Sequence, residues 1–228
     1  MYRFNLAIKR CFDVVVSLML FVLFLPLFLL VIAAIKLDSP GPAIFKQERR
    51  TKNGVIFQMF KFRSMYVDAI NTGPVFCFEN DSRETRVGRF LRKTSIDELP
   101  QLINILKGEM SIVGPRPCLP TELGEFETLN KRYKKRFEVS GGLTGLAQIK
   151  GRNTILWHEK ISYDNEYIEE FKKIGILLDL KIIYITIIQI FVHDGVYHIK
   201  RDGKMNSIEA SEQLETEVIR DAHIPDET

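Results

Sequence analysis

Two adjacent acidic residues, Asp97 and Glu98, precede a helical pattern in the middle of the chain. If Asp97 is the N-cap, Pro100 falls in the first turn, where its missing N–H costs no hydrogen bond, and Gly108 marks the helix end. The Ser95-to-Glu98 spacing also fits a capping box, but that start places Pro100 one turn into the helix. We therefore expect Asp97 to cap this helix. Helix starts favour anions, so the position suits an ionised carboxylate or a phosphate group.

Basic residues surround this acidic pair in the sequence. Arg116 stands between two prolines in Gly114-Pro115-Arg116-Pro117, which restrict the backbone on both sides of a planar guanidinium suited to bidentate phosphate binding. The residues that precede the pair are Arg83, Arg86, Arg89, Arg92 and Lys93. An acidic pair at a helix start is most often only a cap. The surrounding cations favour a site for phosphate chemistry.

A further cationic segment is the predicted strand over residues 55–64, where Phe60 and Phe62 alternate with Lys61 and Arg63. Alternation places the two rings on one face of the strand and the two cations on the other. This face is either solvated or a wall for an anionic ligand, and the residues alone leave both readings open. We expect another strand over residues 43–47.

The glycine-rich segment over residues 140–145 is predicted to be a flexible loop whose backbone, ending at Gly145, can approach a ligand closely. It lacks the pattern of a P-loop. Gln148 and Arg152 follow it in the next segment.

The N-terminal region has no charged side chain from residue 14 to residue 35, which is long enough for a helix to cross a bilayer and too long for the apolar part of a signal peptide. Pro26 breaks the helical hydrogen bonding in the middle, and both flanks are basic, with Lys9 and Arg10 on the first. Because basic residues stay on the cytoplasmic side, a hairpin that enters and returns satisfies the rule better than a span. Composition alone leaves both open. We expect Asp13 to pair with Arg10.

The remaining pattern predicts a loop over 71–83, a short basic helix over 84–93, a polar helix over 121–139, and helices over 156–171 and 174–192. The last helix is apolar, but Asp179 and Lys181 interrupt it, which favours a buried or interfacial helix over a span. From residue 201 onward the chain is acidic and poor in apolar residues, as is typical of a loosely ordered tail.

Composition narrows the class of protein. A chain of 228 residues with 46% hydrophobic residues fits one domain with appendages and a core of ordinary size. The net charge of +3 is too mild to indicate nucleic-acid binding. Cys11, Cys77 and Cys118 form neither a CxxC motif nor a pattern with histidine, so a zinc site or a disulfide framework is not expected.

Taken in order, these motifs resemble the monotopic bacterial phosphoglycosyl transferases, also called bacterial sugar transferases. The resemblance covers about residues 5–200, and the joint order of the motifs is specific although each is weak alone. The matching segments are Lys9-Arg10 with Asp13, Ser39-Pro40-Gly41-Pro42, Phe60-Lys61-Phe62-Arg63-Ser64-Met65, Asp97-Glu98-Leu99-Pro100-Gln101, Gly114-Pro115-Arg116-Pro117, Leu143-Thr144-Gly145-Leu146-Ala147-Gln148 and Gly151-Arg152.

The resemblance implies an α-rich α/β fold at the cytoplasmic face of the bacterial inner membrane. Residues 1–38 would form a re-entrant membrane hairpin. Residues 39–204 would form a compact cytosolic domain with a few short strands and interfacial amphipathic helices, and residues 205–228 the acidic tail. No nucleic acid is expected as a partner, and a homodimer is left open.

The resemblance also implies a reaction. Such enzymes transfer a sugar-1-phosphate from a UDP-sugar to undecaprenyl phosphate, release UMP and begin the assembly of envelope glycoconjugates such as exopolysaccharide. Asp97 would be the nucleophile that forms a phosphosugar–aspartate intermediate, and Glu98 would help to hold Mg²⁺. The other implied roles are phosphate binding by Arg92, Arg116, Lys61 and Arg63, nucleotide binding by Gln148, Arg152 and Gly145, and membrane or lipid contact by Lys9, Arg10 and Pro26.

The chain departs from the family pattern at three places: Leu25-Pro26 replaces a common Ser-Pro, Gly141-Gly142 replaces a Pro-Gly, and Cys118 replaces an acidic residue. The chain also resembles the minimal form of the family, whose members often use N-acetylated or diamino UDP-sugars. Two other hypotheses remain. A membrane-anchored scaffold would not need the intact acidic pair, and a Mg²⁺-dependent UDP-sugar phosphohydrolase would need a base to position water, whereas no histidine lies near the pair in sequence.

Overall fold

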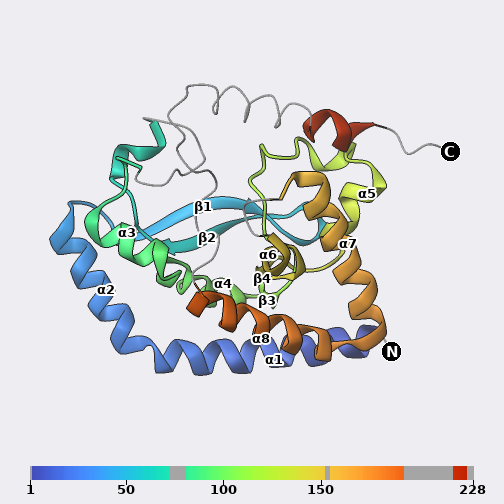
Figure 1. Ribbon diagram of the computed structural model, residues 1–228, viewed down its shortest axis with the longest axis horizontal. Helices are drawn as coiled ribbons and strands as arrows, with labels where there is room; N and C mark the ends of the chain where they lie inside the picture. The colour runs from blue at the N-terminus through green and yellow to red at the C-terminus, as the bar shows by residue number, and fades with distance from the viewer. Residues whose placement is uncertain (1, 72–80, 152–154, 193–217, 225–228) are drawn as a thin grey trace.

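The computed structural model describes residues 2–71, 81–151, 155–192 and 218–224, in which helices surround two small sheets (Figure 1). The helices are α1 (Tyr2–Leu23), α2 (Leu25–Asp38), α3 (Arg86–Lys93), α4 (Gln101–Lys107), α5 (Lys131–Lys134), α6 (Leu146–Gly151), α7 (Trp157–Ile174) and α8 (Ile176–Val192). The strands are β1 (Ile44–Arg50), β2 (Ile56–Phe62), β3 (Ser111–Val113) and β4 (Gly142–Thr144). Single 3-10 turns are η1 (Lys52–Gly54), η2 (Val67–Asn71), η3 (Ile96–Glu98), η4 (Phe126–Thr128) and η5 (Lys135–Glu138).

The two sheets have two strands each. β1 and β2 form an antiparallel hairpin, and β3 and β4 pair in parallel. The predicted strands over 43–47 and 55–64 are confirmed, as are the basic helix over 84–93 and the helices over 156–171 and 174–192. Most of the predicted loop over 71–83 lies outside the described residues.

The apolar N-terminal segment is broken into two helices that meet at an angle of 60°. Pro26 lies in the first turn of α2, where its missing N–H leaves no helical bond unmade, so the predicted interruption is confirmed. Within the described residues, no single helix is long and apolar enough to cross a membrane, whereas α1 and α2 together pass that test.

The first polar residues of α1 reach into the protein. Arg10 donates to the carbonyls of Ile105 and Leu106 at 2.6 and 3.0 Å, where it satisfies the open end of α4. Asp13 accepts from the Ser111 hydroxyl at 2.7 Å and from the next backbone N–H at 3.0 Å, which anchors β3. The predicted Asp13–Arg10 pair is therefore wrong, because each side chain finds backbone groups that need a partner.

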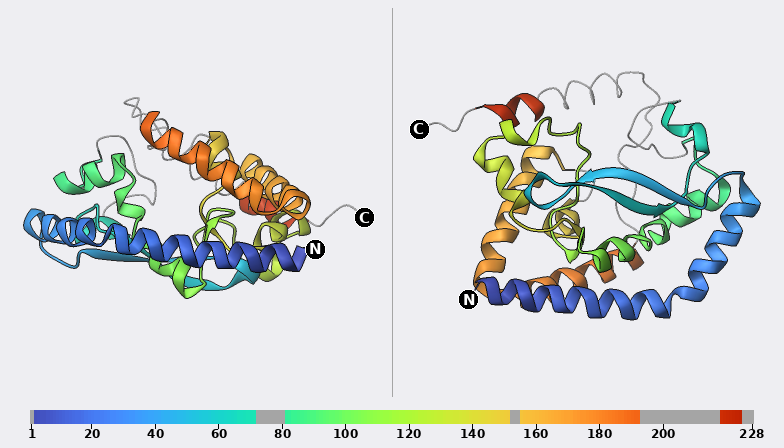
Figure 2. Two further views of the ribbon diagram at one scale, coloured as in Figure 1. Left: turned by 90° about the horizontal axis from the view of Figure 1, so that it is seen from below. Right: turned by 180° about the vertical axis from the view of Figure 1, so that it is seen from behind.

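A buried ion pair joins α1 to α8. Lys9 Nζ lies 2.6 Å from Asp179 Oδ2, and both side chains are less than one tenth exposed. The Tyr167 hydroxyl of α7 donates to the other carboxylate oxygen of Asp179 at 2.8 Å. α8 begins beside the N-terminal end of α1 and diverges from it along its length (Figures 1 and 2). Three helices thus converge on a single carboxylate.

Behind this junction, α4 lies between α1 and the β1–β2 hairpin (Figure 2, right). The largest core cluster joins α4 and β2 to α7 and α8, and its members Ile105 and Ile168 are fully buried. Burying such a side chain stabilises the fold by about 1.5–3 kcal/mol. A separate cluster, built around Phe28 and Phe62, packs α2 against β2 and α3. Both N-terminal helices are therefore attached to the layer that carries the acidic pair.

The predicted polar helix over 121–139 is wrong. The segment forms η4, α5 and η5 instead. Gly124 has a φ of 72°, which breaks the helical path, and the Asn130 side chain accepts from the Tyr133 N–H at 3.1 Å and starts α5 afresh. Local capping therefore outweighs the polar helical pattern.

The predicted flexible loop over 140–145 is also wrong, because residues 142–144 form β4. A Cβ atom on Gly142 would lie 2.1 Å from the backbone nitrogen of Gly114. Glycine is needed here because two backbones approach closely in a parallel pair.

Part of the predicted acidic tail is packed. Residues 218–223 form a helical turn, and Ala222 is fully buried. The Asn130 N–H donates to the carbonyl of Ala222 at 2.8 Å, and the Tyr133 hydroxyl donates to Asp221 Oδ2 at 2.5 Å. The other tail residues lie outside the described ranges.

Candidate active site

The acidic pair occupies the turn between α3 and α4. Ser95 adopts a left-handed conformation, with φ of 57°, and Asp97 and Glu98 follow it within η3. Pro100 is the N-cap of α4, and Gly108 ends that helix with φ of 88°. The predicted helix end is confirmed, whereas the predicted N-cap role of Asp97 is wrong. The reversal at Ser95 places the carboxylates in a separate tight turn before the helix.

Glu98 is held by two cations. Lys61 Nζ lies 3.1 Å from Oε1, and Arg116 donates to Oε1 at 2.5 Å and to Oε2 at 3.4 Å. The predicted cationic face of β2 and the proline-flanked arginine therefore meet at one carboxylate. A two-armed guanidinium contact fixes direction as well as charge. These contacts leave the Glu98 side chain one fifth exposed.

The two carboxyl groups differ in proton affinity. Burial raises the pKa of Asp97 to about 6, against the opposing charges of Lys61 and Arg92, while neighbouring Glu98 raises it further. Burial alone would raise the pKa of Glu98, but the charges of Arg116 and Lys61 outweigh it and hold this pKa well below its ordinary value. Asp97 has no ion pair with the described residues. Near neutral pH the site therefore presents a fixed anion next to a carboxylate that titrates just below neutrality.

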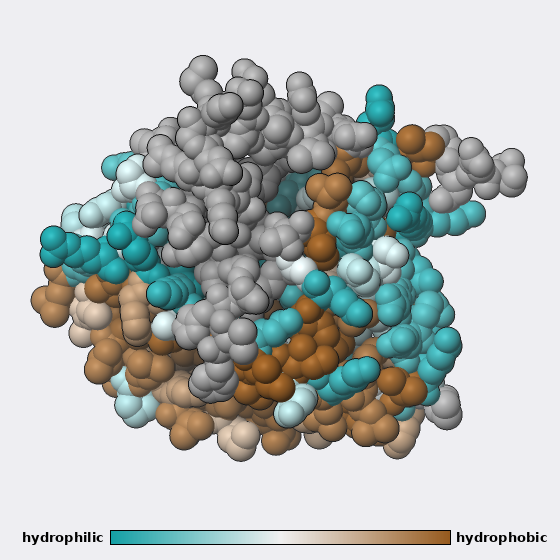
Figure 3. Space-filling model, in the orientation of Figure 1, coloured by the Kyte–Doolittle hydropathy of each residue, from teal (hydrophilic) through white to brown (hydrophobic). Residues whose placement is uncertain are grey.

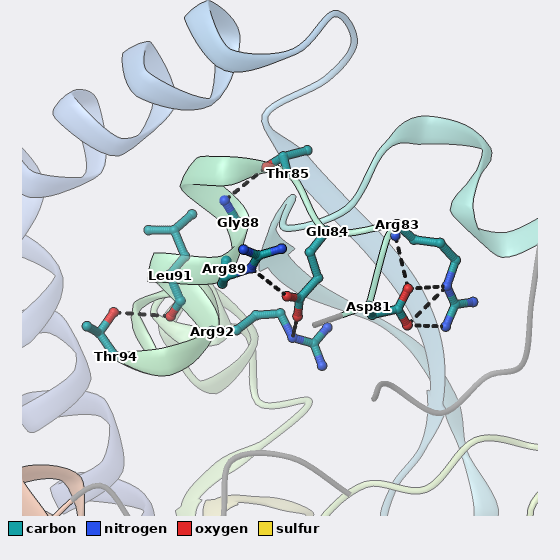
Figure 4. A network of polar contacts seen from close by, with 9 residues as sticks. All are labelled: Asp81, Arg83, Glu84, Thr85, Gly88, Arg89, Leu91, Arg92 and Thr94. Carbon is teal, nitrogen blue, oxygen red and sulfur yellow. Dashed lines mark hydrogen bonds and ion pairs between the residues drawn. The ribbon is translucent and has the colours of Figure 1, made fainter. Parts of the chain in front are cut away.

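Arg92 is positioned by a buried acid (Figure 4). Its Nε lies 3.2 Å from Glu84 Oε1, and Arg89 Nε lies 3.5 Å from the other oxygen. Thr85 caps α3 by accepting from Gly88 N at 2.9 Å, which fixes the helix that carries both arginines. The charge of Arg92 still lowers the pKa of Asp97.

Arg63 is placed elsewhere. Its Nη2 donates to the carbonyl and hydroxyl oxygens of Ser39 at 2.7 and 2.8 Å, at the end of α2. The backbone of Gly41 passes so close that a Cβ there would lie 2.3 Å from Arg63 Nη1. The structure brings Lys61 to the acidic pair and uses Arg63 to hold the turn after the N-terminal helices.

Of the predicted nucleotide-binding residues, Gly145 lies against the arginine loop, which is the segment over residues 114–117. Gly145 packs on Gly114, whose carbonyl oxygen would be 2.1 Å from an added Cβ. Both polar atoms of the Gln148 amide are buried without a hydrogen-bond partner among the described residues. Such an amide suits a ligand that supplies a donor and an acceptor together. Arg152 lies outside the described residues.

Three further charged residues lie near the site and were not indicated by the sequence: Arg49, Glu122 and Lys160. Arg49 of β1 donates to the carbonyl of Pro117 at 3.2 Å and lies 3.7 Å from Glu122. Lys160 of α7 lies 5.0 Å above the Trp157 ring, and burial lowers its pKa. They come from segments far from the acidic pair in sequence. Only strand alternation could have indicated Arg49, and no local pattern indicated the other two.

Among the residues described, no cluster of three or more His, Cys, Asp and Glu side chains forms a metal site. Mg²⁺ does not require one, because it keeps several waters and is commonly bound by one or two carboxylates together with substrate phosphates. The ionised, partly exposed carboxylate of Glu98 beside Asp97 fits that mode. Glu98 would hold the ion, which would supply positive charge to a diphosphate.

Lys9 and Arg10, which were predicted to contact lipid, bind groups of the protein in this arrangement, and Pro26 lies at the bend. Over residues 11–33, the exposed residues of the same helices are apolar, as Figure 3 shows along the edge formed by α1 and α2. These residues include Val15, Leu18, Met19, Val22, Leu29 and Leu30.

The chain is similar to several curated proteins. It is 41% identical over 198 residues to the UDP-glucose:undecaprenyl-phosphate glucose-1-phosphate transferase of Klebsiella pneumoniae, which covers 85% of this chain and 42% of that protein. It is 41% identical to the protein of the same name from Caulobacter vibrioides, over 83% of this chain and 72% of that protein. It is 46% identical to the galactosyl transferase CpsE of Streptococcus agalactiae, over 68% of this chain and 36% of that protein.

The chain therefore spans less than half of the Klebsiella and Streptococcus relatives. The sequence model of the bacterial sugar transferase family matches residues 4–193, which include the bent helix pair, the acidic pair and the arginine loop. The family resemblance drawn from the motifs is confirmed, and the chain belongs to the bacterial sugar transferase family.

Proposed function

We propose that this protein transfers a sugar-1-phosphate from a UDP-sugar to undecaprenyl phosphate and releases UMP. The observation that carries the proposal is the pairing of a buried carboxyl, Asp97, with the cation-bound carboxylate of Glu98. The relatives named for undecaprenyl-phosphate transfer support the acceptor and the donor class. The product would begin an envelope glycan.

In the proposed first step, a carboxylate oxygen of Asp97 attacks the phosphorus that carries the sugar. A bond forms between this oxygen and phosphorus, the bridging P–O bond of the diphosphate breaks, and UMP leaves with the bridging oxygen and its electron pair. Arg116 and Lys61 face the region where charge builds up on the phosphoryl oxygens. Fixed cations stabilise such charge without reorganising.

In the proposed second step, a phosphate oxygen of the lipid attacks the same phosphorus, and the aspartyl–phosphorus bond breaks. The product is a sugar diphosphoryl lipid, and Asp97 is regenerated as a carboxylate. Because the acceptor is already an anion, this step needs no general base. Two steps let a water-soluble donor and a lipid acceptor use one site in turn.

The membrane position is part of the proposal. The apolar exposed edge of α1 and α2 would enter the cytoplasmic leaflet of the inner membrane and return, with the bend at Pro26. α8 adds further exposed apolar side chains to this surface, including Leu177, Leu180, Tyr184, Ile187 and Ile188. Amphipathic surfaces of this kind bind the boundary between head groups and acyl chains.

The test incubates purified protein with undecaprenyl phosphate, Mg²⁺ and UDP-sugars radiolabelled in the sugar. UDP-glucose and UDP-galactose come first because of the relatives' names, and UDP-N-acetyl sugars follow. We expect a labelled lipid, UMP and, before lipid is added, protein that carries the label on Asp97. All three should be lost when EDTA removes the metal. Sugar phosphate released without lipid would indicate a hydrolase, and no product with any donor would indicate a scaffold.

Asp97→Asn tests the nucleophile. The amide keeps the size of the side chain but cannot form the phosphoryl–enzyme bond, so we expect labelled protein and labelled lipid to fall below about one thousandth of the wild-type level. Glu109→Gln, at a partly exposed carboxylate beyond α4, is the matched control. An Asp97→Asn variant that loads the lipid at the normal rate would contradict the covalent mechanism.

A further inference from the structure

The loop that presents Arg116 to Glu98 is held through its carbonyl oxygens. The prolines on both sides of Arg116 have no N–H to donate, so this loop binds its neighbours mainly through backbone carbonyl oxygens. The donors that bind consecutive carbonyls are Arg136 Nη2 to Arg116 at 2.8 Å, Arg49 Nη1 to Pro117 at 3.2 Å and the N–H of Arg50 to Cys118 at 2.8 Å. The direction of Arg116 is therefore set by residues outside its own segment.

Arg136 is the most strongly fixed of these donors. Its side chain is 3% exposed, and its Nε donates to Asp164 Oδ2 of α7 at 2.8 Å, where the carboxylate is 2% exposed. The guanidinium carbon lies 5.2 Å from the ring centroids of both Phe137 and Trp157. An ion pair on one edge and aromatic rings near the guanidinium leave it little freedom to move.

We propose that Arg136 and Asp164 are positioning residues that act on the reaction through Arg116. The contacts run from Asp164 to Arg136, then to the backbone of Arg116, and through its side chain to Glu98. Because the Arg116 guanidinium lies at the end of a long side chain, a small rotation of its peptide displaces it far from the acidic pair. The inference rests on the proposed function for the identity of the ligand, a nucleoside diphosphate.

The alternative is that the buried pair only holds η5 against α7. A double-mutant cycle separates the two roles, with UDP as the probe because every UDP-sugar contains it. Asp164→Asn keeps an acceptor oxygen but removes the charge that orients Arg136, and Arg116→Gln removes the guanidinium on which it acts. Affinity for UDP with Mg²⁺ is measured by calorimetry on the full chain in detergent.

We expect Arg116→Gln to weaken UDP binding about tenfold and Asp164→Asn about three- to tenfold. The double variant should bind no more weakly than Arg116→Gln alone, because the pair has nothing left to position. Losses that multiply in the double variant would overturn the inference, as would an Asp164→Asn variant with wild-type affinity.

Arg136→Lys provides the same comparison should Asp164→Asn fail to show a cooperative thermal transition, because a lysine keeps the charge but lacks the second directed N–H. Glu169→Gln is the matched control, since Glu169 lies on the same helix and pairs with Lys135 at the surface. Its affinity for UDP should be unchanged. Wild-type protein that binds UDP but transfers no sugar phosphate would contradict the proposed function. The double-mutant cycle would still test the positioning role, because it measures UDP affinity and not transfer.

Discussion

At the scale of single residues, the acidic pair is asymmetric because only one member contacts cations among the described residues. Glu98 is bound by Lys61 and Arg116, whereas Asp97 is buried beside it without an ion pair. Two like charges in neighbouring positions then force their pKa values apart. The member with the higher pKa retains more electron density for a bond to phosphorus, and the member with the lower pKa remains a constant anion.

This asymmetry predicts the pH dependence of the first step. With a pKa of about 6, Asp97 is protonated below that pH and ionised above it. The rate of UMP release in a single turnover should therefore rise between pH 5 and 7, with a midpoint near 6. Lys61 lowers the pKa of Asp97, so Lys61→Gln should move the midpoint to higher pH.

The control for this measurement is Lys107→Gln, since Lys107 is half exposed and pairs with Glu109. Its profile should match that of the wild type. A rate that does not change from pH 5 to 7, or a Lys61→Gln midpoint that moves to lower pH, would contradict the assignment of this titration to Asp97.

At the scale of elements, the N-terminal helices are integrated into the fold rather than appended to it. Lys9, Arg10 and Asp13 bind α8, α4 and β3 in turn. The position of the acidic pair relative to α1 is therefore set by buried polar contacts, which are costly to break. The proposed function requires such a coupling, because the site would have to meet a lipid phosphate.

Lys9→Met tests the strength of this connection. It leaves Asp179 buried without its cation, which costs about 3–5 kcal/mol and should lower the apparent Tm in detergent by about 10 °C. Adding Asp179→Asn removes the unpaired charge and should restore most of the loss. Equal Tm values for the single variant and the wild type would show that the pair contributes nothing to this junction.

The sequence predicted most elements, because periodicity, capping residues and prolines act over short distances. The hairpin strands, α3, α7, α8 and the end of α4 at Gly108 follow from such local signals. Two of the misses depend on distant partners: β4 exists because β3 lies beside it, and Asp13 turns from Arg10 to the backbone of β3. Two others are local: Asn130 caps a new helix within 121–139, and the left-handed Ser95 moves the acidic pair into a turn before α4. Within the site, the family resemblance implied phosphate-related roles for Lys61 and Arg116 near Glu98, whereas their contacts to its carboxylate and the contact from Arg136 to the Arg116 carbonyl required the fold.

At the scale of the whole molecule, one edge is apolar, whereas hydrophilic residues gather on other parts of the described surface (Figure 3). The apolar edge coincides with α1 and α2, and α8 adds exposed apolar side chains. A patch of this extent is unusual on a soluble monomer. In the proposed membrane position, it would give the molecule one preferred orientation at a bilayer surface.

Liposome flotation measures this preference. Val22→Glu combined with Leu29→Glu places two charges on exposed positions of α1 and α2, and we expect the fraction of protein bound to anionic liposomes to fall at least about tenfold. Ile56→Glu, at an apolar position in the β1–β2 hairpin that is about half exposed, is the control and should bind normally. Unchanged flotation of the double variant would contradict membrane entry by the bent pair.

The docked turn at residues 218–223 has a consequence for synthesis. Ala222 belongs to the same core cluster as Cys118 and Tyr133, so that cluster is complete only after residue 222 has left the ribosome. The cluster that joins α2, β2 and α3 requires nothing beyond Leu99 and can form while translation continues. α2 can thus pack on β2 and α3 early on the growing chain, whereas the cluster around Cys118 and Tyr133 closes only after residue 222 has emerged.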